Sequence, residues 1–130
     1  MRTFKQIERT PEFTKDLKKL LKRFRTLEED LETFINVQMV LYHKHNIDNQ
    51  GIVPISGLEI HTPKIFKARK FACKALKGKG ARSGIRVIYS YFQVIERIEL
   101  IEIYYKGNQE NEDRERIHTL YRAARSPSVT

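Results

Sequence analysis

The spacing of the apolar residues changes along the chain, and this change limits the possible fold more than any other feature. Between residues 10 and 45 the apolar side chains recur every three to four positions, which is typical of amphipathic helices. From residue 65 onward they come in short runs rich in β-branched and aromatic residues, which indicate strands. The sequence therefore predicts an α+β fold in which helices pack on a sheet.

The N-terminal part predicts one short strand and a helical hairpin. Residues 3–8 alternate between apolar and polar side chains, as a half-buried strand does. Thr10 followed by Pro11 indicates the start of a first helix, with Thr10 as N-cap. Thr26 with Glu29 three positions later is a capping-box pattern, which predicts a second helix. The short connection between the two helices favours an antiparallel pair.

Three further strands are expected in the second half. Residues 45–63 are rich in glycine, proline and asparagine, so we expect an ordered loop without regular structure there. Strands are predicted over residues 65–73, 85–92 and 97–105. The last of them changes its apolar parity at Leu100-Ile101, which indicates a central strand buried on both faces or a bulge. Helical spacing in the same segment is an open alternative.

A last helix is expected after residue 108, with acidic residues at its start and arginines near its end, as the helix dipole favours. The predicted order is strand, two helices, three strands, helix, with a mainly antiparallel sheet. A chain of 130 residues suits one domain, which we expect over residues 1–125. Residues 126–130 are predicted to be a disordered tail.

Composition excludes several classes of protein. The apolar runs are far shorter than the roughly 20 residues of a membrane-spanning helix, and the N-terminus lacks the pattern of a secretory signal. The single Cys73 cannot form an internal disulfide. His43 and His45 are two positions apart on a helix and point to different faces, so no metal site is expected. We therefore expect a cytoplasmic protein without a cofactor.

The positive charge is concentrated in one stretch. The net charge is +9, and residues 64–86 hold nine basic residues and no acidic one. Outside that stretch 16 basic residues face 16 acidic ones, so the whole excess lies within it. A concentrated cationic region attracts polyanions and commonly contacts phosphates. The alternative is a solvated basic face that only aids solubility. The nine residues are Lys64, Lys67, Arg69, Lys70, Lys74, Lys77, Lys79, Arg82 and Arg86.

Some of these cations are expected to converge. Side chains two apart in a strand share a face, so Lys67 and Arg69 point the same way. Arg86 faces away from its apolar neighbours on the next strand. If the two strands form a hairpin, these three cations meet on one open face of the sheet, and Lys106 reaches its rim. Such a group can clamp a phosphate and stabilise a transition state that gains negative charge.

Three runs of sequence resemble those of a known family. Residues 83–89 read Ser-Gly-Ile-Arg-Val-Ile-Tyr, preceded by Phe-Lys-Ala-Arg at 66–69 and followed by Ile-Glu-Ile-Tyr-Tyr-Lys at 101–106. Together with the element order, they resemble the RelE/ParE toxin superfamily, and in particular the RelE-type toxins of bacterial and archaeal toxin–antitoxin pairs. The resemblance extends from about residue 13 to about residue 106.

This resemblance implies a RelE-like fold and a metal-independent endoribonuclease that cleaves mRNA at the ribosome and so inhibits translation. The cleavage would proceed by attack of a 2′-hydroxyl on the adjacent phosphate. Lys67 and Arg69 match the basic pair of the family, Arg86 its phosphate-stabilising arginine, and Lys106 the basic or histidine position at the end of the last strand. The implied partners are mRNA, the ribosome and a cognate antitoxin, with no membrane. Further RNA contacts are expected from Lys70, Lys77, Lys79 and Arg82.

Two alternatives belong to the same resemblance. The ParE branch shares the fold and acts on DNA gyrase, and a relative without catalytic activity could bind RNA only. The family also has a tyrosine a few residues past the last strand, which has no counterpart between Gly107 and Asp113.

Overall fold

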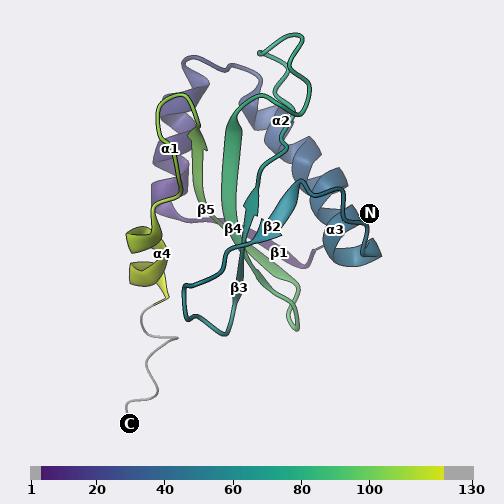
Figure 1. Ribbon diagram of the computed structural model, residues 1–130, viewed down its shortest axis with the longest axis vertical. Coiled ribbons are helices and arrows are strands. Elements are labelled where there is room, and N and C mark those ends of the chain that lie inside the picture. The colour runs from purple at the N-terminus through teal and green to yellow at the C-terminus, as the bar shows by residue number, and fades with distance from the viewer. Residues whose placement is uncertain (1–3, 122–130) are drawn as a thin grey trace.

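The computed structural model describes residues 4–121 and contains a five-stranded sheet with helices on both faces (Figure 1). No helix in these residues is long and apolar enough to cross a membrane. The start of the predicted first strand and the predicted tail fall outside this range. The elements are β1 Gln6–Arg9, α1 Pro11–Leu21, α2 Leu27–Thr33, a π-helix Phe34–Met39, α3 Val40–His45, β2 Ile52–Pro54, β3 Lys64–Ala68, β4 Ile85–Phe92, β5 Arg97–Tyr105 and α4 Arg114–Leu120.

The sheet has the order β1-β5-β4-β3-β2, and every pair is antiparallel except β1 with β5. The predicted α+β class, element order and mainly antiparallel sheet are confirmed. The segment expected to be irregular differs, because its residues 52–54 form an additional edge strand. Ile52 is buried there and pairs with Ala68 of β3. A strand of three residues is too short to show a period in the sequence.

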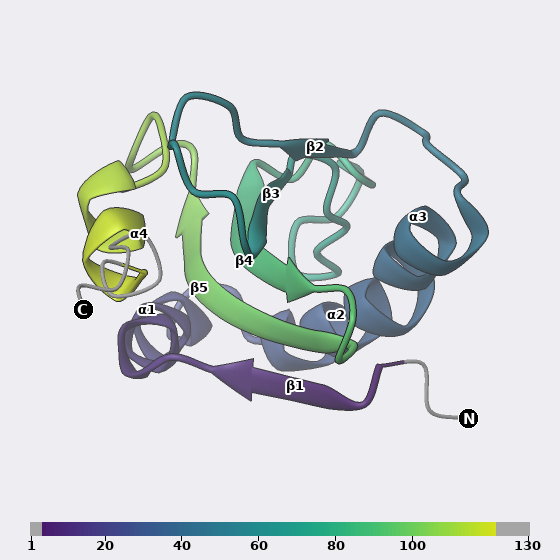
Figure 2. The same cartoon turned by 90° about the horizontal axis from the view of Figure 1, so that it is seen from below.

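Each face of the sheet has its own core. Figure 2 shows β4 and β5 between α4 on one side and the α2–α3 helix on the other. The larger core, on the side of α1, α2 and α3, includes Phe13, Leu17, Leu27, Leu31, Val87, Leu100 and Ile103. The smaller core, under α4 and the loop before β3, includes Leu58, Ile65, Ile88, Ile101, Tyr104 and Ile117.

One extra residue in β5 connects the two cores. Ile88 of β4 pairs with Glu102 and the next residue, Tyr89, pairs with Leu100, so Ile101 is a bulge. Before Ile101 the even-numbered residues of β5 face the larger core, and after it they face the smaller core. The parity change therefore reflects both predicted causes, a bulge and burial on both faces, and the helical alternative is wrong.

The bulge is held by polar contacts from two helices. The Ile101 carbonyl accepts a hydrogen bond from Arg116 of α4 at 2.9 Å. Arg116 also forms an ion pair with Asp16 of α1 at 2.7 Å, and Asp16 accepts the Ile103 N–H at 3.3 Å. Because a buried carbonyl or N–H without a partner is costly, these bonds stabilise the irregular backbone of β5 and join α1 to α4.

The two predicted helix starts have different outcomes. Thr10 is the N-cap of α1, and its hydroxyl oxygen accepts a backbone N–H three residues later at 3.2 Å. The capping box at Thr26 is wrong: its hydroxyl donates to Asp30 at 2.6 Å. Asp30 is buried and also accepts the Lys74 N–H at 3.1 Å, while Glu29 lies outside and pairs with the Lys74 ammonium. A buried carboxylate without hydrogen-bond partners costs more free energy than an N–H at an exposed helix start, which water can satisfy, so the hydroxyl bonds to Asp30.

The first strand is not half-buried as predicted, because all four residues of β1 are exposed. Ile7 is 42% exposed, and Phe4, just before the strand, is buried in its place. The Phe4 ring packs edge-on against Tyr91 at 5.6 Å. β1 is an edge strand that pairs with β5, and its exposed side chains Gln6, Glu8 and Arg9 make polar contacts with Arg97 and Glu28.

A π-helical stretch interrupts the helix that runs through α2 and α3. Residues 34–39 form this stretch, which accommodates an extra residue per turn. About one turn later His43 lies among the rings of Phe66, Tyr89 and Tyr91 and shares a hydrogen bond of 2.7 Å with the Tyr89 hydroxyl. Burial lowers the pKa of His43 to about 4, so the imidazole is neutral at neutral pH.

The lowered pKa of His43 predicts a loss of stability in mild acid. Above pH 6.5 the imidazole is neutral in both states, and between pH 6.5 and 4 the unfolded chain binds a proton that the folded chain does not. The free energy of unfolding should fall across this window, by roughly 2–3 kcal/mol in total. Urea unfolding of the protein and of His43→Gln at pH 7, 6 and 5 measures the difference. Parallel pH profiles for the two proteins would contradict the assignment.

Asp30 is predicted to hold the segment after β3 on the helix. Asp30→Ala removes the acceptor of the Thr26 hydroxyl and of the Lys74 N–H. The cost should be about 1–3 kcal/mol in the free energy of unfolding, with faster amide exchange in residues 72–76. Glu29→Ala is the control, because its ion pair with Lys74 is exposed and should contribute little. Equal effects of the two variants would show that the buried carboxylate is not the anchor.

Candidate functional site

Three of the predicted cations lie on the α4 side of the sheet. Lys67 pairs with Ile88, and Arg86, two residues before Ile88, pairs with Tyr104. Lys67 and Arg86 are therefore diagonal neighbours on adjacent strands, about 7–8 Å apart. Lys106 follows Tyr104 on the same face, and its N–H bonds to Gly84 at 2.8 Å. Lys67 and Arg86 thus share a face of the sheet, Arg69 lies beyond the end of β3, and the catalytic role of these residues stays a prediction.

The face that carries Lys67 is covered rather than open. The segment between β5 and α4 lies over it, and Glu112 of this segment forms an ion pair with Lys67 at 2.9 Å. The two side chains are only 18% and 8% exposed. Burial acts to lower the pKa of Lys67, but the interactions with Glu112 and Tyr104 together outweigh it and the pKa is raised. Burial acts to raise the pKa of Glu112, but Lys67 and a backbone N–H lower it, so both groups are charged at neutral pH.

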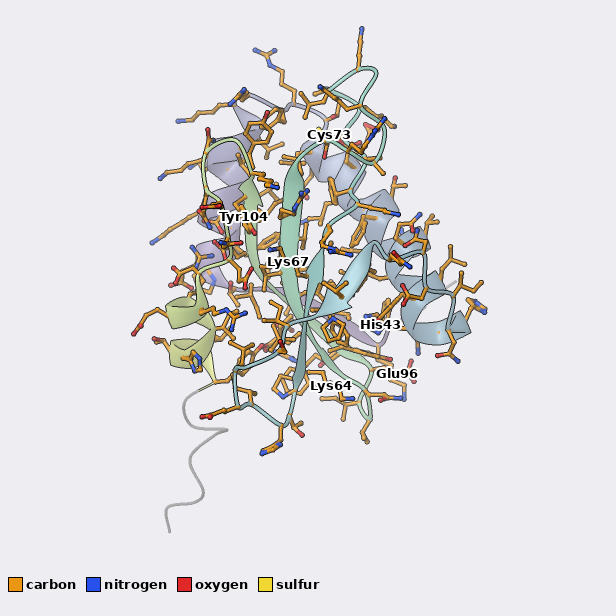
Figure 3. All side chains as sticks on the ribbon, in the orientation of Figure 1. His43, Lys64, Lys67, Cys73, Glu96 and Tyr104 are labelled. Atoms are coloured by element: carbon orange, nitrogen blue, oxygen red, sulfur yellow. The ribbon has the colours of Figure 1, made fainter. Side chains whose placement is uncertain are left out.

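Tyr104 is a site residue that the sequence did not predict. Its side chain is buried and lies beside Lys67 (Figure 3). Its hydroxyl is the one buried side-chain polar atom of the described residues without a hydrogen bond of good geometry. Burial raises the pKa of Tyr104, and the Lys67 ammonium opposes this effect. The hydroxyl therefore keeps its proton at neutral pH. The bulge at Ile101 places this ring on the α4 face, and the parity change at that position is the signal that could have found it.

A second carboxylate on this face is structural. Glu102 is 2% exposed and accepts the Asp113 N–H at 2.8 Å and the Gln109 amide at 2.7 Å. Burial raises the pKa of Glu102, and these hydrogen bonds act against the rise. Both donors belong to the segment that carries Glu112. Glu102 thus fastens that segment over Lys67.

The two arginines are at the end of the β3–β4 pair. The Arg86 Nη1 donates to the Arg69 carbonyl at 3.0 Å, and the Arg69 guanidinium donates to the Gln50 carbonyl at 3.1 Å. The Arg69 N–H donates to the Gly51 carbonyl. β3 ends at Ala68, before the predicted end at residue 73. Arg69 is exposed and Arg86 is half-buried. A guanidinium has five N–H donors, and those of Arg86 other than Nη1 make no hydrogen bond within residues 4–121.

Gly84, just before β4, allows the chain to turn close to the end of β5. It has a φ of +88°, a conformation that side chains disfavour. A Cβ there would lie 3.2 Å from the Tyr105 ring. The glycine of the Gly-Ile-Arg motif is therefore required by the backbone turn and by the close approach of β5.

The basic stretch does not form the single cationic surface that its sequence indicates. Side chains alternate between the faces of β3, so Lys64 lies on the α3 side and Lys67 on the α4 side. Glu112 and Glu29 pair with Lys67 and Lys74 and neutralise them. The segment of residues 69–84 runs past the end of the sheet beside α2 (Figure 1). It carries the predicted RNA contacts Lys70, whose ammonium donates to the Asn49 carbonyl at 2.8 Å, and the exposed Lys77, Lys79 and Arg82.

The arrangement can bind an anion and donate protons. The pKa values of Lys67 and Tyr104 are raised, so both side chains are protonated at neutral pH, and they share a face with the Arg86 guanidinium. The deprotonated group in contact with Lys67 is Glu112, and its lowered pKa makes it a weak base. Among residues 4–121 no group of three or more histidine, cysteine or acidic side chains is placed to hold a metal ion.

Comparison with known proteins gives matches in structure only. No protein-family model matches the sequence. No curated protein matches it either. The structure is similar to the crystal structure of an archaeal RelE–RelB complex from Pyrococcus horikoshii OT3, with 16% identity and a TM-score of 0.48 over 82% of this chain and 98% of that chain. It is also similar to the solution structure of a conserved hypothetical protein from Helicobacter pylori, with 20% identity and a TM-score of 0.46 over 78% of this chain and 94% of the other.

Proposed function

We propose that this protein is a RelE-like endoribonuclease that cleaves mRNA at the ribosome. The observation that carries the proposal is the Lys67–Glu112 pair beside Arg86 and Tyr104. Lys67 is a half-buried cation that already binds a carboxylate, on the face to which the family motif assigns phosphate chemistry. A site built to hold one oxyanion provides the donors that a phosphate requires.

The proposed reaction is attack of an RNA 2′-hydroxyl on the adjacent phosphate. The 2′-oxygen loses its proton, a phosphorane with increased negative charge forms, and the leaving 5′-oxygen gains a proton. Arg86 and Lys67 stabilise the phosphorane, because cations placed in a water-poor site act strongly on developing charge. Tyr104 has its proton at neutral pH and can supply it to the leaving oxygen. Arg69 and Lys106 hold the neighbouring phosphates from the rim.

Glu112 acts in this proposal as an internal competitor of the substrate. Its carboxylate occupies the Lys67 ammonium at 2.9 Å, so RNA has to displace it before a phosphate can bind. The carboxylate is hydrogen-bonded to Lys67 and anchored through its segment by Glu102. Displacement requires the Glu112 carboxylate to leave the Lys67 ammonium. Once released, Glu112 can accept the proton of the 2′-hydroxyl.

Binding of RNA without cleavage is the second candidate function. The observation that favours it is the absence, among the described residues in contact with Lys67, of a base whose pKa lies near neutrality.

An antitoxin partner and a cytoplasmic location complete the proposal and rest on the family resemblance. The gyrase-directed alternative is tested by DNA supercoiling, which should be unaffected by this protein.

Arg86→Ala should remove transition-state stabilisation without removing RNA binding. We expect the cleavage rate of ribosome-bound mRNA to fall by roughly 10²-fold or more, the scale of a lost oxyanion donor. The measurement is translation in vitro followed by primer extension. Lys79→Ala is the matched control, because Lys79 is exposed on the 69–84 segment and should affect binding only. Equal losses in the two variants, confined to binding, would contradict the role of Arg86.

Glu112→Gln should release Lys67 for RNA. The substitution keeps the size of the side chain and removes its charge, so we expect tighter RNA binding and a salt dependence steeper by about one phosphate contact. Filter binding to a single-stranded RNA at several salt concentrations measures both. Glu110→Gln removes an exposed charge from the same segment and should change the affinity much less. An equal effect of both substitutions would show that only net charge matters and that Glu112 does not mask the site.

A further inference from the structure

A hollow lies on the side of the sheet opposite to Lys67 and Tyr104. It has a volume of about 740 Å³ and lies between α3, residues 61–64 and the turn between β4 and β5. Cavities that hold small ligands have volumes of about 300–1,000 Å³. Figure 3 shows its residues His43 and Lys64 at the same end of the molecule. The proposed nuclease function uses none of its residues.

The inner wall of the hollow is aromatic and rigid. Tyr42 packs edge-on against Phe66 at 5.8 Å, and the His43 ring lies 4.5 Å from the Tyr91 ring. Phe66 and Tyr91 are buried, and Tyr42 is half-buried and lines the opening. His43 is neutral at neutral pH. Tyr42 and His43 are only half-buried, so this uncharged aromatic wall exposes ring surface on which a planar ligand can stack.

The rim of the hollow carries a lysine and a histidine on one side. Lys64 and His61 are exposed and line it, and Lys64 makes no ion pair within residues 4–121. One acidic residue, Asp48, also lines the hollow, and its carboxylate accepts the Gln50 N–H at 2.7 Å. Burial and the charge of Asp48 raise the pKa of Tyr42. Glu96, nearby in Figure 3, is paired with Lys44. At Lys64 the rim offers positive charge to an anionic group next to the aromatic wall.

The opening is bordered by apolar residues that the protein itself does not cover. Val94 and Ile95, in the turn between β4 and β5, are 95% and 53% exposed and line the hollow. Val94 and Ile95 lie at the opening, where they could contact the side of a bound aromatic ligand that faces solvent. Asn46, also at the opening, has an amide that can bond to the polar edge of a ring.

We propose that this hollow binds a nucleotide, with the base against Tyr42 and Phe66 and the phosphate at Lys64 and His61. A purely apolar ligand would leave Lys64 of the rim unused, and a bare phosphate would leave the aromatic wall unused. A nucleoside monophosphate combines a planar ring and an anion in one molecule. The same unit occurs free or as one residue of a single-stranded RNA, and the experiment separates these two sources.

The test is calorimetric titration of the intact protein with the four nucleoside 5′-monophosphates, with adenosine, with inorganic phosphate and with a short single-stranded RNA. We expect at least one monophosphate to bind more tightly than adenosine and inorganic phosphate. Lys64→Ala should weaken monophosphate binding about tenfold or more and leave adenosine binding unchanged. Tyr42→Leu should weaken both.

Lys18→Ala is the matched control, because Lys18 is an exposed cation on the outer face of α1. Lys64 and His61 are also exposed, so their variants keep the test valid if Tyr42→Leu does not fold. If the RNA binds and Lys64→Ala weakens it as it weakens the monophosphate, the source is an RNA residue. The proposal is overturned if no monophosphate binds, if inorganic phosphate binds as well as the monophosphates do, or if Lys64→Ala and Lys18→Ala have equal effects.

Discussion

The extra residue at Ile101 decides which side chains of β5 face which side of the sheet. Without it, Tyr104 would point into the larger core, and the α4 face would lose its only tyrosine from a strand. The bulge persists because Arg116 and Asp16 satisfy its backbone from two different helices. Both the candidate site and the attachment of α4 to α1 therefore depend on one irregular hydrogen-bond pattern.

Much of the fold is encoded in local periodicity and was predictable for that reason. The helical spacing of residues 13–24 and the parity change at Leu100-Ile101 each need only neighbours in sequence to be interpreted. Features that depend on distant partners were not predictable. β2 forms because Ile52 pairs with Ala68 of β3, and Asp30, which accepts the Thr26 hydroxyl, is bound by the backbone of Lys74, 44 residues away. Neither fact is visible in residues close by in the chain.

The same distinction holds for the candidate site. Strand alternation placed Lys67 and Arg86 on one face correctly, since it follows from backbone geometry alone. It could not reveal Glu112, which is 45 residues from Lys67 in sequence. Nor could a count of charges show that Lys64 belongs to the opposite face. A cluster of cations in sequence becomes a surface only after the sheet has divided it and acidic residues from elsewhere have neutralised part of it.

The π-helical stretch at residues 34–39 makes the number of residues in that helix as important as their identity. One residue turns an α-helix by about 100°, so deleting a single position there would rotate all of α3 about the helix axis. His43 would leave the Tyr89 hydroxyl, and Tyr42 would leave Phe66, although no side chain near them had been replaced. Relatives that keep every aromatic residue but have a regular helix at this point would thus have a different inner wall on that side of the sheet.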